Sequence, residues 1–221
     1  SFISFTEKSG IWELTDSKKP IAILVDENEY DGVKNAVSHL RTDIETVTGL
    51  KVFSTNSSLN QNVKIIVGTY GKNQLISKLI EKSDLEGKYE KFIIQTIENP
   101  ADGVEKALVI AGSDLRGTIY GIYELSRQMG VSPWYYWADV PVRKSEKIFI
   151  KPGKFTAGEP AVKYRGIFLN DEAPALNGWS NATFGGFNHL FYEKVFELIL
   201  RLKGNFIWPA MWGSAFFDDD K

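Results

Sequence analysis

The segment 21–26, with the sequence IAILVD, constrains the fold more than any other feature. Its five consecutive apolar residues are typical of a strand that is buried on both faces of a sheet. The next apolar positions recur instead at the 3.6-residue spacing of a helix, and Gly49 stands where a left-handed cap would end it: Val33, Ala36, Val37, Leu40, Ile44 and Val47. A doubly buried strand followed by an amphipathic helix indicates an α/β fold.

The same alternation continues to about residue 155. Further strands are predicted at 2–5, 11–14, 51–55, 63–70, 91–97, 106–112 and 147–150. A short helix follows 63–70, and a second long helix begins at a Ser113 or Asp114 cap and stops at Gly130. Gly117 and Gly121 lie one turn apart on that helix, which predicts a close approach of another backbone or helix there. His39 lies off the apolar stripe and is expected at the surface.

The composition changes after this domain. Residues 151–163 (KPGKFTAGEPAVK) have no apolar period, and we place a linker at 156–163 between a first domain, 1–155, and a second, 164–221. In the second domain, strands are predicted at 164–170 and 205–209. The helix between them, 188–203, carries an apolar stripe of Tyr192, Val195, Phe196, Ile199 and Leu202. A strand, loop, helix and strand in that order form the repeating unit of a parallel sheet or barrel.

Both strands of this second domain end in side chains that could contact a sugar. In a β/α unit, active-site groups lie at the carboxyl ends of the strands. The candidate substrate-binding residues there are Asn170, Asp171, Glu172, Trp208, Met211 and Trp212. Carboxylates accept hydrogen bonds from hydroxyls and can transfer protons, although Asp171 and Glu172 could equally form buried salt bridges or loop caps.

Other candidate sites are weaker. The run Asp218 to Asp220 is read as a solvated loop and not as a metal site, because cation-binding loops interleave their ligands with other residues. His189 is read as a capping or core residue. The segment 68–71 (GTYG) lacks the spacing of a phosphate-binding loop, which argues against nucleotide binding. No metal or cofactor is therefore expected.

Bulk properties narrow the function classes. A formal charge of -2 argues against a dedicated nucleic-acid binder, and no segment approaches the ~18 apolar residues of a membrane span. The absence of cysteine excludes thiol nucleophiles and disulfides. Five of the six tryptophans follow residue 133, and flat aromatic rings either fill cores or stack on sugars. This enrichment raises carbohydrate above other ligands.

Three segments resemble glycoside hydrolase family 115, the xylan α-glucuronidases. They are 165–179 (RGIFLNDEAPALNGW), 184–216 (FGGFNHLFYEKVFELILRLKGNFIWPAMWGSAF) and, less specifically, 111–142 (AGSDLRGTIYGIYELSRQMGVSPWYYWADVPV). The resemblance implies an N-terminal α/β domain with a mixed sheet flanked by helices, followed by a TIM barrel. It also implies a secreted or periplasmic enzyme that needs no cofactor and removes glucuronic acid, or its 4-O-methyl ether, from glucuronoxylan with inversion.

A whole barrel takes about 250 residues, so residues 164–221 can hold only its first unit and second strand. We therefore expect the catalytic acid and base beyond residue 221, and an inactive fragment. Two alternatives remain open: a stand-alone carbohydrate-binding or interaction module, and a relative of other α-glucuronidases or of β-hexosaminidases. Apolar residues outside the main stripe of the helix at 188–203, such as Phe191 and Leu198, predict that the second domain packs against the first domain or against a second copy in a homo-oligomer.

Overall fold

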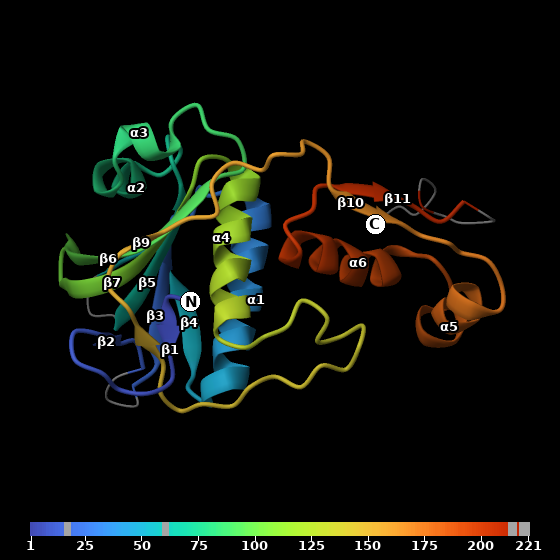
Figure 1. Ribbon diagram of the computed structural model, residues 1–221, viewed down its shortest axis with the longest axis horizontal. Helices are drawn as coiled ribbons and strands as arrows, with labels where there is room; N and C mark the ends of the chain where they lie inside the picture. The colour runs from blue at the N-terminus through green and yellow to red at the C-terminus, as the bar shows by residue number, and fades with distance from the viewer. Residues whose placement is uncertain (16–18, 59–61, 212–215, 217–221) are drawn as a thin grey trace. The chain divides into compact units, whose positions relative to one another are not determined.

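The computed structural model describes residues 1–15, 19–58, 62–211 and 216. These form two compact units, Ser1–Ala161 and Val162–Lys221 (Figure 1). The boundary between them falls within the segment 156–163. No helix among the described residues is both long and apolar enough to cross a membrane.

The first unit is built on a six-stranded mixed sheet. Parallel pairing joins β3 to β4 and β5, and β5 to β7, whereas β6 pairs antiparallel with β7 and β9. Strand β3 is buried along its whole length, as its apolar run predicts. The order across the sheet is β4 (Val52–Thr55), β3 (Ile21–Val25), β5 (Val63–Thr69), β7 (Val104–Gly112), β6 (Phe92–Ala101) and β9 (Lys154–Phe155). The α/β fold with a mixed sheet and flanking helices is confirmed.

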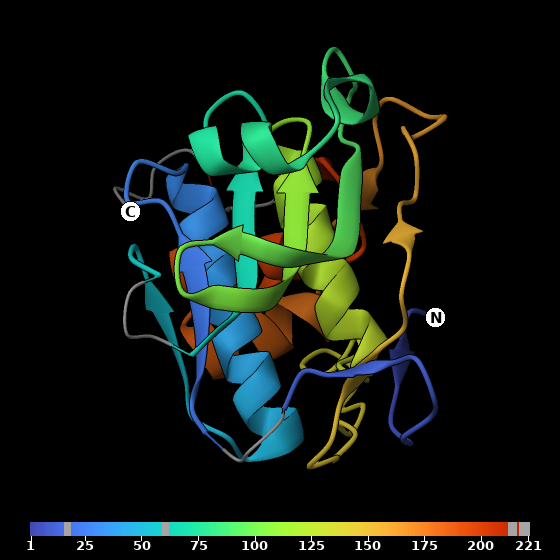
Figure 2. The ribbon, with the colours of Figure 1, turned by 90° about the vertical axis from the view of Figure 1, so that its left-hand side faces the viewer.

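Two long helices lie side by side against one face of this sheet, α1 (Asp31–Thr48) and α4 (Leu115–Gln128) (Figures 1 and 2). Helix α1 ends at Gly49 in the left-handed conformation, as predicted. His39 of α1 is half-buried, and its Nδ1 lies 2.7 Å from the hydroxyl of Tyr123 in α4. The expectation of a surface histidine is therefore wrong, because the polar flank of α1 meets the neighbouring helix.

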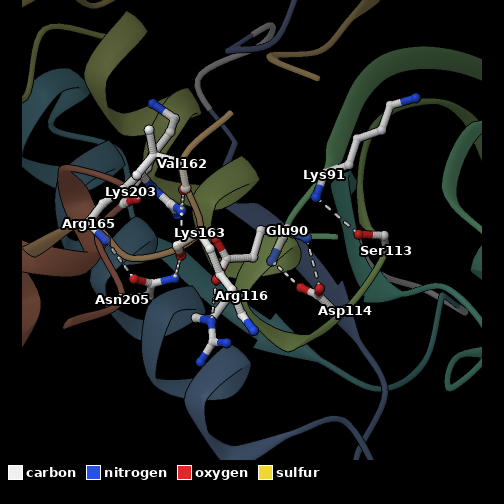
Figure 3. Close-up of polar contacts among 11 residues, drawn as sticks. Glu90, Lys91, Ser113, Asp114, Arg116, Val162, Lys163, Arg165, Lys203 and Asn205 are labelled. Carbon is white, nitrogen blue, oxygen red and sulfur yellow. Dashed lines mark hydrogen bonds and ion pairs between the residues drawn. The ribbon is translucent and has the colours of Figure 1, made fainter. Parts of the chain in front are cut away.

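Helix α4 begins at the predicted cap. The Asp114 carboxylate accepts the N–H of Gly117 at 2.7 Å and that of Glu90 at 2.8 Å, and the Ser113 hydroxyl oxygen accepts the N–H of Lys91 (Figure 3). These bonds fix the start of α4 to the start of β6. A Cβ added at Gly117 would lie 2.3 Å from the carbonyl oxygen of Lys91, so the predicted close approach is confirmed.

The other face of the sheet is covered by two short helices, α2 (Gln74–Leu79) and α3 (Lys82–Leu85). Ile76 and Leu85 from these helices are buried in one cluster with Ala107 and Val109 of β7. Residues on alternate positions of β7 face α4 instead, since a Cβ at Gly121 would lie 2.8 Å from Cγ2 of Ile110. The sheet is thus buried on both sides, which explains the continuous apolar runs of its central strands.

A second, three-stranded antiparallel sheet completes the first unit, in the order β1 (Ile3–Ser4), β8 (Phe149–Ile150) and β2 (Trp12–Glu13). The segment after it is hydrogen-bonded to the loop that precedes β6. Glu159, inside the predicted linker, accepts the N–H of Tyr89 at 2.9 Å, and this bond, together with Lys88, lowers the pKa of its carboxyl group from the ordinary value.

The second unit contains two parallel strands, β10 (Gly166–Phe168) and β11 (Phe206–Trp208), with Phe168 opposite Trp208. Between them lie α5 (Ala175–Phe184) and α6 (His189–Arg201). The residues between the strand predicted at 164–170 and the helix predicted at 188–203 were expected to form a loop, and α5 corrects that expectation. Its Gly, Asn and Ser content gives no clear helical stripe in the sequence. Asn188 caps α6, so His189 is the first helical residue.

The buried face of α6 also differs from the predicted stripe. Phe196 and Leu202 are exposed, whereas Phe191 and Leu198 are buried. The physical reason is the aromatic cluster around Phe191, whose ring centroid lies 5.9 Å from that of Phe184 and 5.0 Å from that of Phe187. The β-α-β arrangement fits a barrel unit, but the barrel and the docking of this unit remain predictions.

Candidate functional site

The carboxyl ends of β10 and β11 lie next to each other because the strands are parallel. The ladder continues one residue further, where the N–H of Leu169 donates to the carbonyl oxygen of Trp208 at 3.0 Å. At the opposite end, the Arg165 N–H donates to Asn205 Oδ1 at 3.0 Å, and the Arg165 guanidinium donates to the Lys203 carbonyl at 2.9 Å (Figure 3). Both ends of the strand pair are thereby fixed, and the segments that follow Leu169 and Trp208 start side by side.

Asp171 is a buried member of the predicted triplet, with 2% of its surface exposed. Its Oδ2 accepts the backbone N–H of Met211 at 2.9 Å. This carboxylate therefore joins the segment after β10 to the segment after β11. This contact fits the alternative that Asp171 caps a loop. The assignment of Asp171 to a substrate pocket remains a prediction.

Asn170 and Glu172 are both exposed, on either side of Asp171. The Asn170 side-chain oxygen accepts the N–H of Glu172 over a long 3.4 Å. The peptide bond between Ala173 and Pro174 is cis. Of the three predicted polar residues, only Glu172 presents an exposed carboxylate at this end of the strands.

Trp208 and Met211 project from the second strand end with about half of their surface exposed. The Trp208 indole Nε1 donates to Met211 Sδ at 3.2 Å, and the indole meets Phe168 edge to face with ring centroids 5.6 Å apart. Phe168 is also exposed. Trp212 and the run Asp218 to Asp220 lie outside the described residues.

One further residue, Tyr192, belongs to this end of the unit but was not predicted as a site residue, and Trp179 is a further exposed aromatic residue of the same unit. The Tyr192 hydroxyl, buried on α6, accepts the N–H of Ala210 at 3.1 Å, and so holds the chain between Trp208 and Met211. Trp179 on α5 is 41% exposed and contacts Phe184 edge to face. The sequence marked Tyr192 only as part of an apolar stripe, and α5 itself gave no signal.

The described part of the arrangement offers groups that suit a sugar ring. Exposed indole and phenyl rings offer apolar surface for a sugar face, and Glu172 and Asn170 offer hydrogen-bond acceptors for its hydroxyls. Hydrolysis of a glycosidic bond needs a general acid and a second carboxylate. Of the described carboxylates at this end, that of Asp171 accepts the Met211 N–H and that of Glu172 is exposed. No group of three or more potential metal-ligating side chains occurs among the described residues.

Comparison with known proteins places these features in a family. The family model for glycosyl hydrolase family 115 matches residues 157–221. This range includes the residues described above at the carboxyl ends of β10 and β11, namely Phe168, Asn170, Asp171, Glu172, Trp208 and Met211, which together form the strand-end site. A solved family 115 4-O-methyl-α-glucuronidase with specificity for decorated arabinogalactans is 40% identical, with a TM-score of 0.76 over 91% of this chain. The chain belongs to glycoside hydrolase family 115. It spans 26% of the length of that solved relative.

The first unit has a second family relationship. Residues 12–125 match the model of the glycosyl hydrolase family 67 N-terminus.

A family 20 exo-β-N-acetylglucosaminidase from Vibrio harveyi is 12% identical, with a TM-score of 0.47 over 93% of this chain and 23% of its own. A chitobiase from Flavobacterium johnsoniae is also 12% identical, with a TM-score of 0.42 over 76% of this chain and 21% of its own. TM-scores below 0.5 define no fold relationship, and no curated protein matched the chain.

Proposed function

We propose that this family 115 chain is the N-terminal part of an α-glucuronidase that releases glucuronic acid, or its 4-O-methyl ether, from a decorated plant polysaccharide. The observation that carries the proposal is the strand-end site, where exposed Trp208 and Phe168 lie beside the residues that follow β10. A sugar chain would stack on these rings while Glu172 and Asn170 accept hydrogen bonds from its hydroxyls.

Glucuronoxylan is the proposed substrate. The solved relative acts on decorated arabinogalactans, so the competing polysaccharide is an arabinogalactan with the same uronic acid. Both would present an acidic sugar on a neutral backbone, and the aromatic pair would contact whichever neutral backbone is bound.

The proposed chemistry is inverting hydrolysis by an acid and a base held about 6.5–9.5 Å apart. Neither is assigned to a described residue. The chain of residues 1–221 is therefore expected to be inactive alone, and to act only with the remaining strands of a complete barrel. We further propose that the whole enzyme is secreted or periplasmic, because its substrate is a polymer too large to enter a cell.

Mutation of Trp208 in the longer enzyme tests this proposal. Trp208→Ala should raise KM for release of glucuronate from glucuronoxylan about tenfold, since the loss of a sugar–aromatic contact worth about 1.4 kcal/mol corresponds to a factor of ten. Trp134→Ala is the matched control, because Trp134 is similarly exposed but lies in the first unit. Equal KM values for the two variants would contradict a role of Trp208 in substrate binding.

The second candidate function is a non-catalytic carbohydrate-binding module, favoured by the exposed aromatic pair Phe168 and Trp208. Assay of the longer enzyme and of residues 1–221 on glucuronoxylan and on decorated arabinogalactan separates the two functions. Release of glucuronate by the longer enzyme alone supports the glucuronidase proposal. Binding without release by both proteins would favour the module.

A further inference from the structure

A cleft outside the strand-end site lies in the first unit. It has a volume of about 750 Å³ and lies where β2, the start of β5 and the β6–β7 hairpin meet, with Trp12, Lys64 and Asn99 among its lining residues. A volume of this size falls within the range of about 300–1,000 Å³ that small-molecule sites occupy. The cleft is at the amino end of β5. Neither the packing of the helices nor the helix caps described above explain it.

A β-bulge shapes one wall of the cleft. Glu98 pairs with Lys106 and Ala101 pairs with Val104, so Asn99 and Pro100 on β6 both stand opposite Glu105 alone on β7. Asn99 has a left-handed backbone with a φ of 50°, a conformation that asparagine tolerates better than most residues. Bulges redirect side chains and often lie beside functional sites. Here the bulge places Asn99 and Glu105 in the lining of one cleft.

The chemistry of the lining selects against charged and apolar ligands. Lys64 and Lys106 are balanced by Glu98 and Glu105, so the lining carries no net charge that would attract phosphate. Lys106 Nζ lies 3.1 Å from Glu98 Oε1, and Lys64 Nζ lies 5.5 Å from the centroid of the Trp12 ring. Ammonium, amide and carboxylate groups together match a ligand that both donates and accepts hydrogen bonds, as sugar hydroxyls do.

We propose that this cleft is a binding site for a neutral oligosaccharide chain, separate from the strand-end site. Trp12, half-buried at the wall, supplies the aromatic surface against which the apolar face of a sugar can lie. Glu98, Asn99 and Glu105 are exposed and can reach its hydroxyls. The site holds a polysaccharide by its undecorated backbone and does not depend on the proposed glucuronidase activity.

Titration of the 1–221 chain with xylohexaose and with a β-1,3-linked galactohexaose, followed by calorimetry, tests the proposal. The test variant is Glu98→Gln with Asn99→Asp. Both residues are exposed, and aspartate also tolerates the left-handed conformation, so the fold should be kept. The matched control is Glu86→Gln with Asn28→Asp, the same pair of changes at exposed residues outside the cleft.

We expect binding of at least one oligosaccharide by the wild-type chain and by the control, with Kd raised about tenfold in the test variant. Absence of wild-type binding at concentrations up to about 10 mM would overturn the proposal, since that limit excludes even a weak sugar site. Equal Kd values in test and control variants would overturn it as well. Loss of binding in Trp208→Ala, with the test variant unaffected, would place the sugar at the strand-end site and leave the proposed function standing.

Discussion

Asp171 holds Met211 by a hydrogen bond between its Oδ2 and the backbone nitrogen, 2.9 Å apart. The two residues are forty positions apart in the sequence and belong to segments that follow different strands. Because Met211 in turn accepts the indole N–H of Trp208, the buried carboxylate determines how the exposed aromatic surface of the strand-end site is presented. We therefore propose that Asp171 acts as a positioning residue.

Replacement of Asp171 tests this role. Asp171→Ala should lower the free energy of unfolding by about 1–3 kcal/mol, since the part-buried Met211 N–H loses its acceptor. Asp171→Asn keeps an oxygen at the same place and should lose less. Denaturant unfolding of the 1–221 chain, followed by tryptophan fluorescence, measures both values. An Ala variant as stable as the wild type would show that the bond stabilises nothing.

Replacement of Glu172, unlike that of Asp171, should affect activity and leave the free energy of unfolding nearly unchanged. Its side chain is exposed, so Glu172→Gln should change the free energy of unfolding by less than about 0.5 kcal/mol. In the longer enzyme, loss of the charged acceptor should lower kcat/KM for glucuronate release about tenfold. Kinetics on glucuronoxylan together with thermal unfolding separate the two effects. Unchanged kcat/KM would place Glu172 outside the substrate pocket.

Two glycines on helices should respond with opposite signs to alanine. Gly117→Ala should destabilise the chain, because the new Cβ would lie 2.3 Å from the Lys91 carbonyl oxygen and the start of α4 would have to move. Gly178→Ala on α5 should stabilise it by about 0.5–1 kcal/mol, since nothing lies within 4 Å of the added Cβ and alanine favours a helix. Denaturant midpoints of both variants check the signs. A stable Gly117→Ala chain would contradict the close approach.

The contact between Glu159 and Tyr89 should depend on pH. The Tyr89 N–H favours the ionised carboxylate and lowers the pKa of Glu159, so the folded pKa lies below the unfolded one. The bond is then fully present above the unfolded pKa and is lost as pH falls through the folded pKa. The amide proton shift of Tyr89, followed by NMR, should titrate with a midpoint below the ordinary glutamate value of 4.5.

Glu159→Gln provides the control for that titration, because glutamine can still accept the N–H but has no proton to lose. The Tyr89 shift of this variant should stay constant across the same pH range. A titration that persists in the variant would assign the effect to another carboxyl group.

Several parts of the fold could be predicted from the residues alone because they depend on local patterns. The apolar run of β3, the stripe of α1 ending at Gly49, and the Asp114 cap of α4 all appear where the sequence indicates them. Asn188 was inferred only as the approximate start of α6, and the structure shows its side chain capping that helix. Hydrophobic periodicity and capping act over a few residues, so a short window of sequence contains the relevant interactions.

The strand-end site was only partly predictable. Its position followed from the strand boundaries, since functional groups gather at the carboxyl ends of parallel strands. The distinction between the buried Asp171 and the exposed Glu172 did not, because neighbouring carboxylates in one loop look alike until their partners are known.

The sequence by itself determined most of the strands and helices, although not α5, and the family to which the motifs point. Only the tertiary structure decided which face of α6 is buried, that His39 meets Tyr123, and that Asp171 binds the backbone of Met211. The reason is physical. Local propensity and hydrophobic period act between near neighbours in the chain, whereas burial and hydrogen-bond partners depend on residues that folding brings together from distant positions.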